Sequence, residues 1–218
     1  QLLGGDGAQV ERVAGVGHLR EDLRKGDAQL RAGGDAAANA VHLCAGGFLG
    51  AQRSHGGPAA HGVRDNGGYR LGDERTTLAE LFAASGRRTG GFVSSFVLDG
   101  RWGIAQGFET YVDDFDLSKL GSASLGEIQR RGDETVANAK RWLSSVAGER
   151  FFCWVHLYDP HTPYAAPEPF AGRYPDEPYN AEIAWTDSLV GRILDHLEAR
   201  GLRERTIVAV MGDHGEGL

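Results

Sequence analysis

Two short runs of large apolar residues dominate the pattern of hydrophobic and polar positions along the chain. They cover residues 151–155 (Phe-Phe-Cys-Trp-Val) and 206–211 (Thr-Ile-Val-Ala-Val-Met). Continuous apolar runs of this length are typical of strands buried on both faces of a parallel sheet. Polar residues follow at once: His156, Asp159 and His161 after the first run, Asp213 and His214 after the second. Because ligands of open α/β sheets bind at the carboxyl ends of strands, we expect one shared polar site.

Helical patterns alternate with these strands. The spacing of apolar residues predicts a helix over 133–146 and a longer one over 180–200, with Ile183 among its inward residues. A capping box at residues 77–80 predicts a third, short helix, and a strand over 91–98 follows it. Alternation of helices and strands predicts an α/β fold, in which a mostly parallel sheet carries helices on both faces.

Two stretches are predicted to be loops. Residues 160–178 are rich in proline, which is excluded from helix interiors and central strands. Residues 99–116 are rich in glycine and aromatic residues and contain Asp113, Asp114 and Asp116. These carboxylates resemble metal ligands, but no apolar strand precedes them. A solvated loop is therefore the favoured interpretation.

The first sixty residues differ from the rest. Gly and Ala make up 25 of the 60, only one aromatic residue occurs, and no strand pattern is visible. We therefore expect a poorly structured segment over 1–60 that contributes little to the sheet, and a separate α/β domain over 61–218.

Composition excludes some classes of function. The formal net charge of −7 argues against nucleic-acid binding, and no apolar run is long enough to span a membrane. The two cysteines give no disulfide framework, and Cys153, inside an apolar run, is expected in the core. An anionic substrate would need a local cation, and a bound metal is the natural one.

Three motifs carry a family resemblance. They are the segment HGVRDNGGYRL to YVDDF over residues 61–115, the run HLYDPHTPY at 156–164, and TIVAVMGDHGEG at 206–217, which follows a long helix. In this order they resemble the catalytic domain of sulfatases, in the alkaline phosphatase superfamily. The resemblance covers residues 60–218 and implies an alkaline-phosphatase-like sheet.

The resemblance implies a metal site at Asp213 and His214. The imidazole favours Mn²⁺ or Zn²⁺ over Ca²⁺, and the sequence does not decide among the three. In the alternative interpretation Asp213 caps backbone amides in a turn and His214 is exposed. Two ligands alone do not complete a site.

The resemblance also assigns His161 to the oxygens of the ester and to protonation of the leaving group. The alternative is a loop histidine stacked on Tyr158 or Tyr164. Asp159 either orients His161 or begins the turn, whereas His156 is expected in the core. His61 and Glu216 are expected to hold a turn and to be solvated, respectively, and His196 to lie on the surface.

The expected function is hydrolysis of a small-molecule or glycan sulfate ester. The alternatives are a phosphodiesterase or phosphonate hydrolase of the same superfamily, and a non-catalytic chain with a vestigial metal site. A sulfatase should place paired aspartates and a nucleophile before the His61 motif, but Cys44 is followed by Ala-Gly-Gly. We therefore expect the chain as printed to be inactive, and hypothesise that residues 1–60 are translated in a wrong reading frame.

Overall fold

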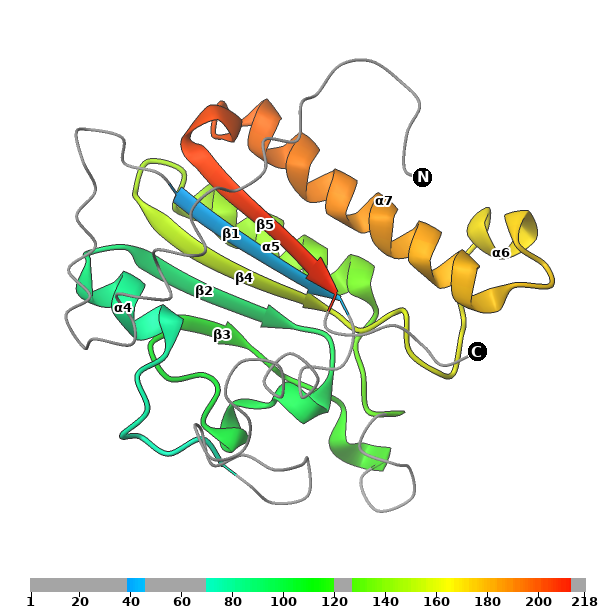
Figure 1. Ribbon diagram of the computed structural model, residues 1–218, viewed down its shortest axis with the longest axis horizontal. Coiled ribbons are helices and arrows are strands. Elements are labelled where there is room, and N and C mark those ends of the chain that lie inside the picture. Colours follow the sequence, from blue (N-terminus) through cyan, green and yellow to red (C-terminus); the bar gives the residue numbers. More distant parts are fainter. Residues whose placement is uncertain (1–38, 46–69, 120–126, 213–218) are drawn as a thin grey trace. The chain divides into compact units, whose positions relative to one another are not determined.

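The computed structural model describes residues 39–45, 70–119 and 127–212, and they contain five strands in one sheet (Figure 1). The strands are β1 (Asn39–Ala45), β2 (Arg88–Val93), β3 (Thr110–Val112), β4 (Phe151–Leu157) and β5 (Thr206–Gly212). Their order is β3-β2-β4-β1-β5, and every neighbouring pair is parallel. The α/β class with a parallel sheet is therefore confirmed.

Helices cover both faces of this sheet. The helices are α4 (Leu78–Ala84), α5 (Gly132–Ser145), α6 (Phe170–Arg173) and α7 (Pro178–Ala199). Short 3₁₀ turns occupy Phe96–Leu98, Gly100–Trp102, Leu117–Lys119 and Arg203–Arg205. The two helices predicted over 133–146 and 180–200 correspond to α5 and α7. None of the helices in the described ranges is long and apolar enough to cross a membrane.

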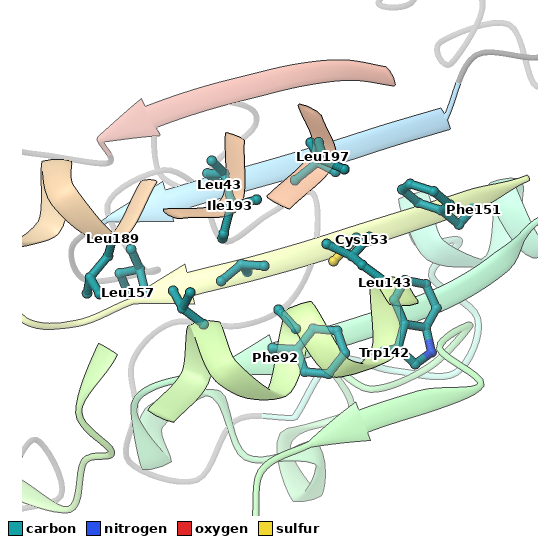
Figure 2. Packing of buried hydrophobic residues seen from close by; sticks show 14 of the residues in the cluster. Leu43, Phe92, Trp142, Leu143, Phe151, Cys153, Leu157, Leu189, Ile193 and Leu197 are labelled. Carbon is teal, nitrogen blue, oxygen red and sulfur yellow. The ribbon is translucent and has the colours of Figure 1, made fainter. Parts of the chain in front are cut away.

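Strand β4 is the centre of the core. All seven of its residues are buried, and alternate side chains point to opposite faces. Phe151, Cys153 and their neighbours on one face pack with α5 and α7, as Figure 2 shows. On the other face Phe152 and Trp154 pack with α4, where Phe82 stacks on Phe152 at 4.5 Å between ring centroids. Cys153 is buried as expected, and burial raises the pKa of its thiol.

The start of α4 shows the predicted capping box. The Thr77 hydroxyl accepts from the backbone N–H of Glu80, and the Glu80 carboxylate accepts from the backbone N–H of Thr77. After the helix, Gly86 adopts a positive φ of 73°, which glycine adopts without strain. The chain then enters β2, which starts and ends earlier than the predicted strand over 91–98.

The expectation that residues 1–60 contribute little to the sheet is wrong for residues 39–45. These residues form β1, a central strand between β4 and β5. It was missed because His42 interrupts the apolar run and alanines flank it, whereas a central parallel strand usually shows a continuous run of large apolar residues. Val41 and Leu43 are both buried. The proposed domain boundary near residue 60 stays a prediction.

Four further expectations need correction. The loop predicted over 99–116 contains the short strand β3, and the loop over 160–178 contains α6. Ile183 on α7 faces outward, because the buried stripe of that helix runs through Trp185, Leu189 and Ile193 instead. Strand β5 lies at the edge of the described sheet and is largely exposed rather than buried.

Candidate active site

The carboxyl ends of three parallel strands lie in one row. Leu157 of β4, Ala45 of β1 and Gly212 of β5 are Cα partners across the sheet (Figure 1). Because the strands are parallel, the segments that follow them leave the sheet at the same edge. The expected common edge is therefore confirmed for the two predicted strands. Asp213 and His214 lie outside the described residues, so their role as metal ligands stays a prediction.

His161 lies four residues beyond the end of β4, with its ring stacked on that of Tyr158. The ring centroids are 4.3 Å apart and the planes differ by 19°. Its Nδ1 is 2.7 Å from the Thr162 carbonyl oxygen, and its backbone N–H donates to the Asp159 carbonyl at 2.7 Å. Since a carbonyl only accepts, Nδ1 carries the proton, and Nε2 is the nitrogen that can exchange one with a substrate. The stacking on Tyr158 that the alternative interpretation expects is present. It involves the face of the ring, so Nε2 at the ring edge can still exchange a proton with a ligand.

Asp159 holds the turn rather than the imidazole of His161. Its Oδ1 accepts from the backbone N–H of Gly132 at 3.1 Å and from the indole Nε1 of Trp185 at 2.9 Å. The carboxylate thus lies at the first turn of α5, where the helix dipole favours negative charge. Burial nevertheless raises the pKa of this carboxyl, and the nearby Asp133 acts in the same direction.

Glu182 is the residue of this region that sequence reasoning missed. It is buried on α7, and its Oε1 accepts from the backbone N–H of Ala165 at 2.6 Å. Burial, followed by the charge of Asp159, raises the pKa of Glu182 to about 7. A signal was available, because Glu182 precedes Trp185, Leu189 and Ile193 at the spacing of the apolar stripe. An acid at a stripe position is unusual and calls for a partner.

The three acids after β3 have structural partners, although the reason first given against a metal role was wrong. Strand β3 does deliver Asp113 and Asp114 to the carboxyl edge of the sheet. However, Asp113 accepts from the backbone N–H of Gly100 at 2.7 Å, and Asp114 pairs with Arg130 at 2.5 Å. Asp116 accepts from the backbone N–H of Ser118 at 2.9 Å. These contacts stabilise the loop itself.

Two further histidines lie away from this edge or inside the core. His156 is fully buried in β4, with its ring centroid 6.4 Å from Trp154 and 6.0 Å from Tyr158. His196 is half-buried rather than on the surface, because Nε2 lies 3.2 Å from the Ser144 hydroxyl of α5. Burial lowers the pKa of His196. His61 and Glu216 lie outside the described residues.

Among residues 39–45, 70–119 and 127–212, no three His, Cys, Asp or Glu side chains are grouped so that they could hold a metal ion. The described part of the edge therefore offers His161 and a set of structural carboxylates. Any metal site would depend on residues outside these ranges, as the assignment to Asp213 and His214 requires.

Solved structures of other proteins share this fold. A putative sulfatase from Bacteroides fragilis superposes with a TM-score of 0.61 at 16% identity, over 85% of this chain and 64% of that one. A phosphonate monoester hydrolase of Agrobacterium radiobacter gives 0.60 at 16% identity, over 82% and 63%. An alkaline phosphatase superfamily protein from Vibrio parahaemolyticus gives 0.59 at 16% identity, over 83% and 55%. The chain spans less than two thirds of each of these proteins.

These similarities define an α/β protein with the alkaline-phosphatase-like fold. The sequence profile described as Sulfatase matches residues 50–218, which is most of the chain. The chain therefore belongs to the sulfatase family. The match begins ten residues before the boundary expected from the sequence motifs. No curated protein matches the chain in sequence.

Proposed function

We propose that the chain is part of a metal-dependent hydrolase of sulfuric esters. The observation that carries the proposal is the row formed by Leu157, Ala45 and Gly212 in a chain of the sulfatase family. Leu157 precedes the segment with His161 and Gly212 precedes Asp213 in the sequence, which supports a common site at this edge of the sheet. A histidine and a pair of metal-binding side chains at one edge suit the binding of a tetrahedral anionic ester.

Asp213 and His214 would hold the divalent cation. A carboxylate and an imidazole are compatible with Ca²⁺, Mn²⁺ or Zn²⁺, but such ions normally take three or more protein ligands. The two residues therefore fit as part of a ligand set. When bound, the cation would supply the positive charge that an anionic ester needs near a chain of net charge −7.

His161 would contact the ester oxygens and protonate the departing oxygen. Its Nδ1 donates to the Thr162 carbonyl and its ring face is held by Tyr158, so Nε2 is the nitrogen presented to a ligand. A proton on Nε2 can be transferred to an alkoxide as the ester bond breaks.

The proposed substrate class is based on the proteins with similar structures. One similar structure, with a TM-score of 0.61 at 12% identity, was solved with its substrate D-glucosamine-2-N,6-O-disulfate. A sulfated sugar or another small sulfate ester is the first candidate. The similarity to a phosphonate monoester hydrolase supports hydrolysis of phosphonate or phosphate esters as the second.

Metal binding by the full 218-residue chain tests the proposed site. We expect isothermal titration with Mn²⁺ to show one site that Asp213→Ala or His214→Ala weakens at least about tenfold, which corresponds to about 1.4 kcal/mol. Asp187→Ala, at an exposed position of α7, is the matched control. Mn²⁺ binding that survives both substitutions would exclude the proposed ligands.

Turnover tests the proposed activity. The resemblance places the nucleophile before His61, where no motif is recognised, and loss of a covalent nucleophile removes most of the rate. The chain as printed should therefore hydrolyse neither aryl sulfates nor aryl phosphates above background with Mn²⁺, Zn²⁺ or Ca²⁺. Robust turnover that Asp213→Ala abolishes would disprove inactivity and show that residues 1–60 supply a nucleophile. Which ester is then turned over would decide between the two substrate classes.

The nucleotide sequence tests the frame hypothesis for residues 1–60. Another forward frame should encode an apolar strand that ends in Asp-Asp or Asp-Thr, followed by a Ser, Thr or Cys shortly before His61. If neither alternative frame encodes these features, the segment is a genuine extension. A non-catalytic chain with a vestigial metal site is then favoured.

A further inference from the structure

We propose that Glu182 is a positioning residue for the segment that carries His161, and that it acts through its hydrogen bond to the backbone of Ala165. Together with Asp159 it fixes both ends of residues 159–165. The importance of this segment rests on the proposed function, because that is what makes His161 reactive. The anchoring itself is a structural claim and is tested without turnover.

The first anchor is Asp159, at the start of the segment. It joins three parts of the molecule, because one carboxylate oxygen accepts from Gly132 at the start of α5 and from Trp185 of α7. The approach is close. A Cβ on Gly132 would lie 2.3 Å from Asp159 Oδ2 and 2.5 Å from Leu189 Cδ1. Neither α5 nor α7 can shift here without moving the start of the His161 segment.

The second anchor is Glu182, at the end of the segment. Its Oε1 accepts from the backbone N–H of Ala165 at 2.6 Å, across the gap between α7 and the loop. The residue is only 3% exposed, so the carboxyl has little water to compensate for a lost partner. Three residues separate His161 from Ala165, and their path is limited by the two anchors.

The two anchors are acids with few hydrogen-bond donors, and Glu182 is the buried one of the two. Asp159 Oδ2 is buried and has no hydrogen-bond donor among the described residues. Protonation of Glu182 would remove its repulsion with the charge of Asp159. Burial and the charge of Asp159 both raise the pKa of Glu182, to about 7, in agreement with this geometry.

The charged groups around Glu182 do not reverse the preference for its protonated form. Arg131, next to the start of α5, acts on Glu182 in the opposite direction, but it already forms an ion pair with Asp133 at 3.2 Å. Asp133 in turn raises the pKa of Asp159. Glu134 acts on Arg131, while Arg192 of α7 lies over the Trp185 ring at 4.8 Å. The surroundings therefore leave burial and the charge of Asp159 as the two effects that favour the protonated form of Glu182.

Amide NMR on the full chain tests the proposal. In the unchanged protein the Ala165 amide proton should shift with a midpoint near pH 7 as Glu182 ionises. Glu182→Gln keeps an acceptor for Ala165 but cannot titrate, so the shift should vanish while protection from hydrogen exchange stays within about threefold. Glu182→Leu removes the acceptor and should reduce this protection at least about tenfold, with a change in the ring-current shift of His161 against Tyr158.

Glu198→Leu, at an exposed position of the same helix, is the control and should change none of these signals. The proposal is overturned if the Ala165 shift persists in Glu182→Gln, or if Glu182→Leu leaves Ala165 exchange and the His161 resonances unchanged. Because no readout uses an ester or a metal, a chain without hydrolase activity still gives a decisive result.

Discussion

Strands β4 and β5 start from the same kind of sequence and end in opposite environments. Both are seven residues long, both are rich in large apolar side chains, and both are followed by Asp and His. In β4 every residue is buried, whereas in β5 only Thr206 is. The difference comes from neighbours, because β4 lies between β2 and β1 and is covered by helices on both faces. Among the described strands, β5 has a partner on one side only.

The comparison shows what an apolar run does and does not specify. It indicates a strand, because the run is too short for a typical buried helix and is rich in aromatic and β-branched residues. It does not specify the position in the sheet, which depends on the elements that pack against the strand. A matched pair of substitutions, one in each strand, measures this difference directly.

The largest expected effect is the difference between Val155→Ala and Val210→Ala. Val155 in β4 is fully buried, so the loss of its two methyl groups should lower the free energy of unfolding by roughly 1.5–3 kcal/mol. Val210 in β5 is 58% exposed, and the same substitution should cost about 0.5 kcal/mol or less. Urea unfolding of both variants provides the measurement. Equal losses would mean that β5 is covered in solution and would cancel the contrast.

A second pair of substitutions tests the close packing beside the segment that follows β4. Gly132→Ala places a Cβ against Asp159 and Leu189, so we expect a loss of roughly 1–3 kcal/mol. Gly191→Ala on α7 meets nothing within 4 Å and should stabilise the helix by roughly 0.5–1 kcal/mol. Thermal or urea unfolding shows whether each substitution lowers or raises the free energy of unfolding. A neutral Gly132→Ala would show that Asp159 moves aside at little cost, which would weaken its role as an anchor.

Much of the fold could be predicted because its signals are local. The Thr77–Glu80 capping box, the stripes of α5 and α7 and the run of β4 each depend on residues close in sequence. Strand β1 could not be predicted in the same way. His42 interrupts the apolar run between Val41 and Leu43, and their burial depends on β4, more than a hundred residues later. Strand β3 was missed because three residues carry too little pattern.

The candidate site was predictable to a smaller extent. The position of His161 beyond the end of a central strand follows from the run before it. The partners of its segment do not, because Asp159 contacts Gly132 and Trp185 through the tertiary fold and Glu182 contacts a backbone N–H. No periodicity in the sequence specifies such contacts. Strand β3 was not predicted either, so the position of Asp113 and Asp114 at the carboxyl edge of the sheet was not expected.

The pH dependence of stability extends the comparison to charged groups, since the buried acid Glu182 binds the segment that follows β4 and the described part of β5 contains no acid. Burial raises the pKa of Glu182 from 4.5 to about 7, so the fold favours its protonated form. The stabilisation is complete below about pH 4.5 and is lost as pH rises through about 7. Unfolding of the unchanged chain should therefore become easier by roughly 1–3 kcal/mol across this window, relative to Glu182→Gln.

Urea titrations of both proteins at pH 4.5 and pH 8 provide that measurement. The raised pKa of Asp159 acts in the same direction and remains in Glu182→Gln. The free energy of unfolding of this variant should therefore still fall with pH, but less steeply than that of the unchanged chain. Identical slopes in the two proteins would show that Glu182 ionises equally easily in the folded and unfolded chains.

The smallest effect on stability, and the one that addresses β5 itself, is expected from its exposed apolar side chains. Ile207 is 54% exposed and Met211 38%, on a strand whose outer edge has no partner among the described strands. Such an edge is a template for association between copies of a chain. Changing both residues to Thr keeps a residue that favours strands and should alter the free energy of unfolding by about 0.5 kcal/mol or less. Sedimentation velocity should nevertheless show less concentration-dependent association, whereas Leu78→Thr, at an exposed position of α4, should leave association unchanged. Association that persists in the double variant would assign it to another surface, and the contrast between β4 and β5 would then concern burial alone.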